Sequence, residues 1–143
     1  KQHPKYRMVH VSNHEDGCIL MADNMFSRSD ELFIEIQNQN QLSLFEYDVQ
    51  NEVINKDDIL QKMTFFLSNF SCEMTADKLI AAFFTEYGVL CKSSTIRDVW
   101  RDMEQSGRIE VIRIPATTST GKPSMFFTED RHKRQSVTIR RKL

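Results

Sequence analysis

The stretch from Ser94 to Thr128 reads STIRDVWRDMEQSGRIEVIRIPATTSTGKPSMFFT, and it decides the fold that we expect. Its first part predicts a helix over Ser94–Ser106, because apolar residues recur there at the helical period, with Ser93 or Ser94 as the cap. Gly107 ends this helix, since glycine is favoured just past a helix C-terminus. The inward-facing positions are Ile96, Val99, Trp100 and Met103.

A β-hairpin is predicted directly after this helix. Ile109–Ile114 reads as a strand, and the polar loop Ala116–Lys122 follows it with the hydroxyl and glycine residues that are typical of turns. The chain then returns through Ser124–Thr128, which we expect to be the second strand of the hairpin.

Two further helices are predicted upstream. The first begins near Asp57 or Asp58, either of which is a good N-cap. The second begins at Thr75, has Asp77 in its first turn, where the helix dipole favours an acid, and stops at Gly88. Their apolar faces are Ile59, Leu60, Met63, Phe66, Leu67 and Phe70 in the first helix, and Leu79, Ile80, Phe83, Phe84 and Tyr87 in the second.

Three helices followed by strand, loop and strand form the winged-helix pattern, so the expected fold class is α+β. This fold commonly presents its third helix and its loop, the wing, to DNA. The pattern is an argument about fold, and fold alone does not determine function.

The residues before the winged-helix candidate divide into two parts. Tyr6–Val11 alternates as a strand does, and a helix follows it; Leu32–Ile36 either continues that helix or forms a short strand. A strand and a helix of this length cannot form a stable core alone. The surface that they pack on is therefore either missing from this piece or supplied by the winged-helix candidate. We expect residues 1–36 to be a strand–helix unit, 37–56 a polar linker, 57–130 the winged-helix domain and 131–143 a basic tail.

The net charge of −1 gives no global signature of nucleic-acid binding, but the charge is unevenly distributed. Residues 1–56 carry 5 basic and 9 acidic side chains, whereas residues 57–143 carry 14 basic and 11 acidic ones. The segment 131–143 holds 6 lysines and arginines and no acid. Such a basic tail is either a solvated end or an arm that contacts phosphate.

The polar side of the third helix is the first candidate site. It offers arginine and glutamine donors for base edges or phosphates, but Asp98 and Asp102 on the same side repel phosphate. The alternative is a solvated face of mixed charge. The candidate nucleic-acid contacts are Lys92, Thr95, Arg97, Arg101 and Gln105 around this helix, Lys122 in the wing, and Arg131, Lys133 and Arg134 in the tail.

The linker contains a short apolar motif, Gln41-Leu42-Ser43-Leu44-Phe45. It is similar at all five positions to the pentapeptide with which many bacterial replication and repair proteins bind the sliding clamp. Gln41 would supply a hydrogen bond, and Leu42, Leu44 and Phe45 would enter an apolar groove. The alternative is that the three apolar residues tether the linker to the protein's own core.

Enzymatic chemistry is not expected in this chain. The 3 cysteines are widely spaced, which argues against a zinc site or a disulfide framework and suits a reducing cytoplasm. We find no phosphate-binding glycine loop and no Ser/His/Asp arrangement, and we expect no metal and no cofactor. No apolar run is long enough to span a membrane.

Tyr6–His14 followed by a helix with Met21 and Met25 resembles the three-Cys-motif partner family of bacterial proteins. The resemblance implies that residues 1–36 are the last strand and helix of an upstream, methyltransferase-like α/β domain, and that a winged-helix region follows. The expected function is therefore a non-catalytic DNA-binding module of a larger bacterial protein. The alternatives are a protein-interaction module that recruits a sliding clamp and an appendage of a methyltransferase-like enzyme.

Overall fold

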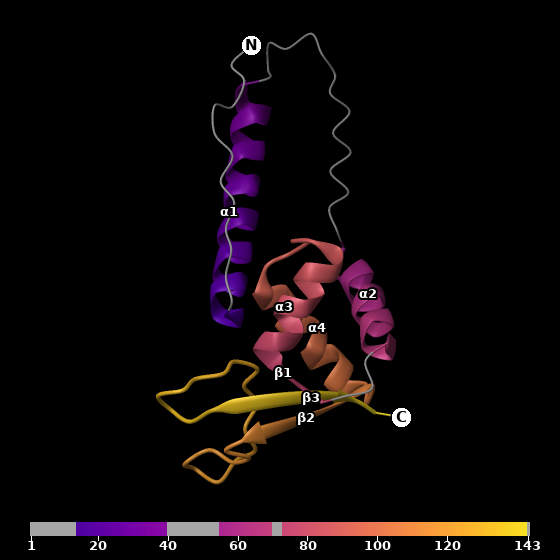
Figure 1. The fold of residues 1–143 in the computed structure, drawn as a ribbon, viewed down its shortest axis with the longest axis vertical. Helices are drawn as coiled ribbons and strands as arrows, with labels where there is room; N and C mark the ends of the chain where they lie inside the picture. Colours follow the sequence, from indigo (N-terminus) through magenta and orange to yellow (C-terminus); the bar gives the residue numbers. More distant parts are fainter. Residues whose placement is uncertain (1–13, 40–54, 70–72, 143) are drawn as a thin grey trace.

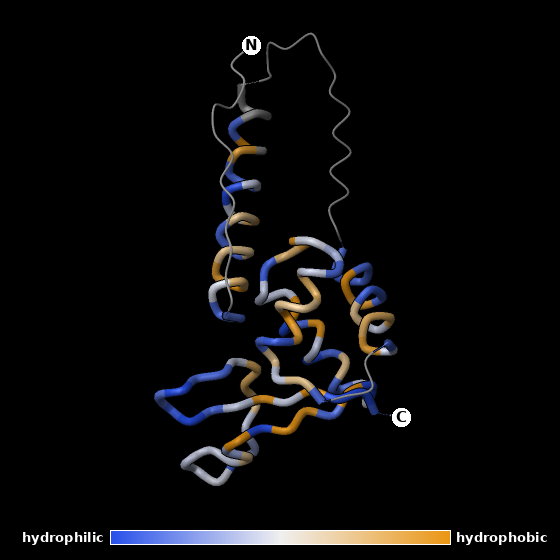
Figure 2. The backbone as a smooth tube through the Cα atoms, viewed as in Figure 1, coloured by the Kyte–Doolittle hydropathy of each residue, from blue (hydrophilic) through white to orange (hydrophobic). Residues whose placement is uncertain are grey.

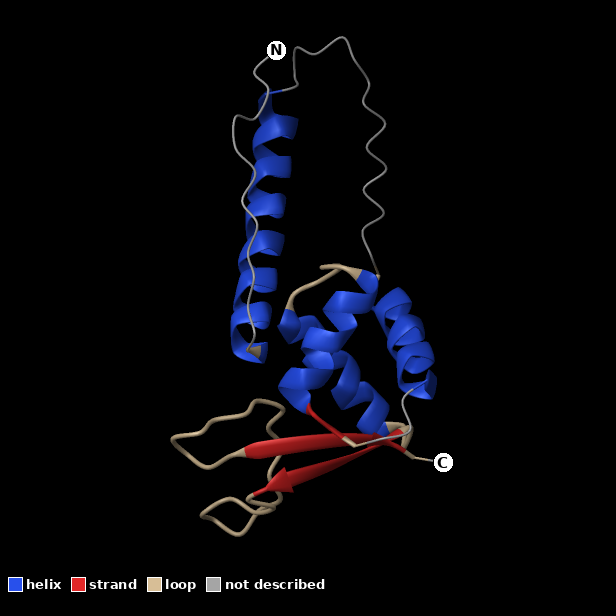
Figure 3. Ribbon diagram, in the orientation of Figure 1, coloured by secondary structure: helices blue, strands red, loops and turns tan. Residues whose placement is uncertain are grey.

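The computed structural model describes residues 14–39, 55–69 and 73–142. Within them the fold is α+β, with helices on one face of a three-stranded antiparallel sheet (Figures 1 and 3). The helices are α1 (Glu15–Gln39), α2 (Lys56–Asn69), α3 (Ala76–Tyr87) and α4 (Ser93–Gln105), and the strands are β1 (Met74–Thr75), β2 (Ile109–Ile114) and β3 (Ser136–Arg141).

The sheet corrects one sequence expectation. β2 is present as predicted, but its partner is β3 and not Ser124–Thr128, which forms no strand. β3 lies inside the segment that we expected to be a basic tail, and it occupies the centre of the sheet order β1-β3-β2. The segment was predicted to be a tail because of its cations, but it forms a strand whose alternate residues, Val137 and Ile139, are buried.

The core lies between the helices and the inner face of the sheet. Trp100 of α4 is fully buried, and the Phe127 ring packs beside it with 6.2 Å between ring centroids. Phe127 comes from the segment that we had expected to be the return strand, so this segment packs its side chain under α4 instead of pairing with β2. The buried faces of α2, α3 and α4 agree with the predicted apolar stripes wherever the structure describes them.

Helix α1 is continuous through Leu32–Ile36 and extends to Gln39, so the short-strand alternative is wrong. Its first turns pack on the rest of the molecule, where Ile19 and Ala22 are buried in the common core. Its later turns extend away from the domain (Figure 1). The second part of the chain therefore supplies a partner surface for the beginning of this helix.

The beginning of α2 differs from the predicted cap. The helix starts at Lys56, and Asn55 rather than Asp57 or Asp58 precedes it. The Asn55 side chain accepts a hydrogen bond from the Asp57 amide, and the Asp58 carboxylate accepts one from the Asn55 amide at 3.3 Å. Asp58 therefore acts from inside the first turn, as the partner in a reciprocal cap.

Helices α3 and α4 are capped by residues far away in the sequence. Helix α3 begins at Ala76, one residue after the predicted Thr75, whose side chain makes no capping hydrogen bond. The Asp77 amide donates instead to Glu129 Oε1 at 3.2 Å. At α4 the predicted cap, Ser93 or Ser94, is wrong, because Ser93 is the first helical residue. The amide and the hydroxyl of Ser93 each donate to the Asp23 carboxylate at 2.6 Å. Thus α1 and the segment before β3 complete the ends of these helices.

The expected strand Tyr6–Val11 and the pentapeptide Gln41–Phe45 lie outside the described residues. None of the helices that the structure describes combines the length and the apolar character needed to cross a membrane.

Candidate nucleic-acid interface and the adjoining polar pocket

The exposed side of α4 is close to electrically neutral. Arg101 Nη1 lies 2.6 Å from Asp98 Oδ1 on the same helix. Asp102 is paired in turn with Lys56 of α2, at 2.6 Å. Both acids on this side of α4 therefore form ion pairs, and Arg101 must exchange its carboxylate partner for a phosphate in order to contact nucleic acid.

The Arg97 side chain is half-buried between α4 and α3. Its side chain is 21% exposed, its Nη2 lies 3.7 Å from Asp77 Oδ1, and its Nη1 donates to Ser93 Oγ at 2.9 Å. The buried Nε has no hydrogen-bond partner in the described structure. Arg97 thus joins α4 to α3. The remaining candidates on α4 are accessible to different degrees, with Lys92 and Gln105 exposed and Thr95 half-buried.

The connection between β2 and β3 makes two separate turns, which leave the same end of the sheet (Figure 1). The first turn is held by a bridge between Thr117 and Pro123, and it carries the exposed Lys122. Lys122 takes part in no ion pair within the described residues. The second turn is closed by a bridge between Asp130 and Gln135, and Figure 2 shows it as a hydrophilic loop.

Arg113 attaches this connection to α4. Its guanidinium donates two hydrogen bonds to the Glu104 carboxylate, each 2.7 Å, and a third to the Phe126 carbonyl. The guanidinium also lies 4.7 Å from the centre of the Phe127 ring, and the side chain is only 7% exposed. Arg113 therefore has a positioning role, because it holds the connection against α4.

The second turn carries the three candidate cations that we had assigned to a tail. Arg131 Nη2 lies 2.6 Å from His14 Nε2 at the start of α1, and Lys133 pairs with Asp130 at 3.3 Å. Arg134 is exposed, with a positive φ of 52°. These cations are therefore held in a turn of defined geometry beside β3, not on a free end.

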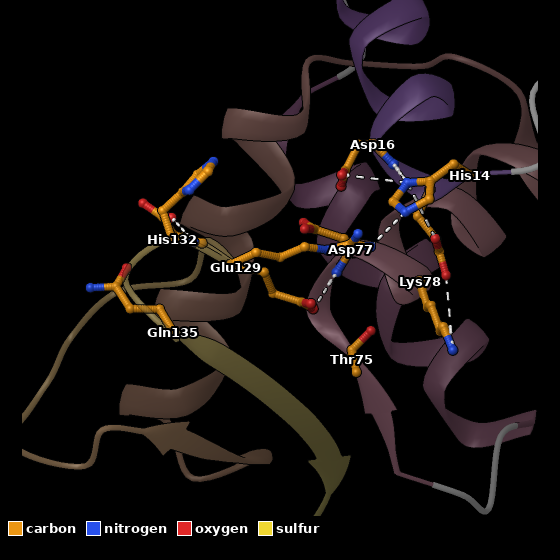
Figure 4. A pocket seen from close by; sticks show the side chains of 11 residues that line it. His14, Asp16, Thr75, Asp77, Lys78, Glu129, His132 and Gln135 are labelled. Carbon is orange, nitrogen blue, oxygen red and sulfur yellow. Dashed lines mark hydrogen bonds and ion pairs between the residues drawn. The ribbon is translucent and has the colours of Figure 1, made fainter.

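A polar pocket of about 530 Å³ adjoins the second turn (Figure 4). The beginnings of α1 and α3 form one side of it, and the segment from Glu129 to Gln135 forms the other. Carboxylates outnumber lysine and arginine side chains in its wall by five to two, and Lys78 of α3 lies 3.9 Å from Glu15 of α1. The pocket therefore joins three elements that are distant in sequence.

Asp77 is the most perturbed group of this pocket. Burial of its carboxyl, together with the negative charge of Glu129, raises the pKa of Asp77 to about 6, although Arg97 acts in the opposite direction. The pKa of Glu15 is lowered, chiefly by a hydrogen bond from its own backbone amide at the start of α1. Within residues 14–39, 55–69 and 73–142, no three His, Cys, Asp or Glu side chains are grouped so that they could hold a metal ion.

The residues that connect these elements are distant from one another in the sequence, and none of them was predicted. Asp23 caps α4 across 70 residues, Glu129 caps α3 across 52, and Arg131 reaches His14 across 117. No local pattern identifies such pairs, because cap and turn signals extend over only a few positions.

Comparisons of the chain with protein-family models, with curated proteins and with solved structures found no match.

Proposed function

We propose that residues 55–142 form a winged-helix domain that binds nucleic acid without catalysis. The observation that carries the proposal is the order α2-β1-α3-α4-β2-β3, with the sheet order β1-β3-β2. This order supports a winged helix in which α4 is the third helix and the β2–β3 connection is the wing. The Arg101 guanidinium lies 6.0 Å from the Phe127 ring of that connection, so α4 and the wing are adjacent.

In this proposal the wing makes the stronger contacts with phosphate. Lys122 and Arg134 are exposed and have no carboxylate partner in the described residues, whereas Arg97 and Arg101 each have one. A phosphate that binds Arg101 must displace the Asp98 carboxylate from it, and the negative charge of Asp98 then repels the phosphate. Contacts with phosphate would position the domain on a duplex but would not by themselves select a base sequence.

A duplex-binding titration tests the assignment. Double substitution Arg101→Ala and Lys122→Ala should weaken binding of a labelled mixed-sequence duplex and reduce the salt slope of log K by about 2, one unit for each phosphate contact. Asp98→Asn should act in the opposite direction and tighten binding, because it frees Arg101 from its ion pair.

The matched control removes one arginine and one lysine elsewhere. Arg28 of α1 pairs with Glu31, and Lys62 is on α2, away from the wing (Figure 1). Substitution of both by alanine should leave affinity and salt slope unchanged. If Arg101→Ala with Lys122→Ala also changes neither quantity, the assignment of this surface is wrong.

A protein-interaction module is the second candidate, and the outer face of β2 favours it. Ile112 and Ile114 are 38% and 60% exposed there, and Met125 of the wing is 59% exposed. Such apolar groups suit a protein partner better than phosphate. A domain that binds no duplex at low salt, but captures a defined protein partner through Ile114, would establish this function in place of the first.

A further inference from the structure

A second groove lies at the other end of the sheet from the wing. It has a volume of about 630 Å³ and is formed by the outer side of α2 together with the residues that begin β2 and end β3. Phe65 of α2 lines it and is 63% exposed, although an aromatic ring of this size is usually buried in a small domain. In Figure 1, α2 and the C-terminal end of β3 lie at the right, whereas the wing leaves the sheet at the left.

Two arginines line the same groove, and neither has an ion-pair partner within the described residues. These are Arg108, just before β2, and Arg141, at the end of β3. Most other arginines of the described chain behave differently. Each of the following pairs with a carboxylate: Arg28, Arg97, Arg101, Arg113 and Arg140.

The strand register shows that the position of Arg141 is unusual. Arg141 is opposite Ile109, just as Ile139 is opposite Val111, so it follows Val137 and Ile139 on the face of the sheet that the helices cover. The preceding two residues of that face are buried and apolar, whereas Arg141 is exposed at the rim of the core, beside α2. A cation at this rim is available to a ligand in the groove.

We propose that this groove binds a single-stranded segment of nucleic acid, with a base stacked on Phe65 and the adjoining phosphates paired with Arg108 and Arg141. Every base has a flat π-face that stacks on an aromatic ring, and a guanidinium binds phosphate through two parallel hydrogen bonds. Gln61, between the aromatic ring and the start of α2, adds an amide to the same wall. An exposed ring beside two free guanidinium groups is the combination that single-strand binding requires.

The charge of the groove supports this ligand. Asp57 is the one carboxylate that lines it, and no ion pair joins Asp57 to either arginine in the described residues, which leaves the wall with a net positive charge. An acidic peptide would also be attracted, but its side chains offer no planar partner at each step along the chain, and the groove is open rather than a deep apolar pocket for an anchor residue. The inference rests on the proposed function for its ligand class, but it uses a different surface.

Fluorescence anisotropy with a labelled oligothymidine tests the proposal on the full chain. Phe65→Ala should weaken binding roughly 5- to 150-fold, the usual effect of losing one stacked base, and should leave duplex binding unchanged. Arg141→Ala should lower the salt slope by about 0.7, the value for one phosphate of a single strand. In Phe65→Trp the new indole should be quenched by the oligonucleotide, while the fully buried Trp100 supplies a constant background.

Matched controls are available on α1. Met25 is 58% exposed, and Arg28 is also exposed, so Met25→Ala and Arg28→Ala remove similar groups outside the groove and should change neither quantity. Unchanged oligothymidine affinity in Phe65→Ala, or tighter binding of polyglutamate than of oligothymidine, would overturn the proposal. Loss of duplex binding in Arg101→Ala with Lys122→Ala, with oligothymidine binding retained, would show that the two surfaces act separately. Oligothymidine binding without any duplex binding would refute only the proposed function.

Discussion

The Asp77 carboxyl should make the stability of the domain depend on pH in a direction that is unusual for an aspartate. Its side chain is 14% exposed and faces Glu129 from the wing and Arg97 from α4, with Asp16 and Glu15 of α1 adding negative charge. Its pKa rises from 3.8 to about 6 on folding, so the folded state binds more protons than the unfolded state between these values. The stabilisation from the protonated form is complete below pH 3.8 and is lost as the pH rises through about 6.

The size of the effect follows from the shift. About two pKa units at 1.36 kcal/mol each give an upper value of about 3 kcal/mol between acid and neutral pH. Asp77→Asn keeps the shape of the side chain and removes the charge. The variant should therefore gain up to about 3 kcal/mol on the wild type at pH 7, relative to the difference between them at pH 3.5.

Urea denaturation followed by the fluorescence of Trp100 at several pH values measures this difference. Asp30→Asn, which removes an exposed charge from α1, is the control and should follow the wild type at every pH. A difference between Asp77→Asn and wild type that does not change with pH would refute the reasoning. The reasoning would also be refuted if Asp77→Asn lost stability relative to the wild type between acid and neutral pH, because the ion pair of Asp77 with Arg97 would then outweigh the burial of the carboxylate.

Three other outcomes follow from the structure and the sequence. Asp23→Ala should destabilise the chain by about 1 to 3 kcal/mol in urea denaturation, because Ser93 loses two hydrogen bonds to a carboxylate; no loss would show that α1 does not cap α4. Ile139→Ala should cost about 2 to 5 kcal/mol as a core truncation, whereas a tail residue would cost less than about 0.5, and thermal unfolding distinguishes the two. A sliding clamp should be retained by the wild type in a pull-down and released by Leu44→Ala with Phe45→Ala; equal retention would reject the motif.

The sequence predicted the elements whose signals are local. The apolar period of α4 and the glycines at 88 and 107 give the third helix and its neighbours, because period and stop signals depend on residues within a turn or two. β2 was found for the same reason. The helix starts were less accurate, since α4 takes its cap from Asp23, which no nearby residue indicates.

The second strand of the hairpin could not be chosen from composition. Ser124–Thr128 is apolar and close to β2, whereas Ser136–Arg141 is rich in cations and distant. The structure selects the latter because its alternate residues fill the core and Arg140 is paired with Glu110 across the outer face. The accessible cations of the candidate site were likewise only partly predictable, because ion pairs such as that of Arg97 with Asp77 depend on tertiary contacts.

The contact between Asp23 and Ser93 has a mechanical consequence. Helix α1 is 25 residues long, or about 37 Å, and Asp23 in its third turn joins it to the first turn of α4. The later turns of α1 extend away from the domain, so a lateral force on them would be transmitted through Asp23 to the start of α4. A partner that bound the later turns of α1 would therefore act on α4 through the Asp23–Ser93 contact.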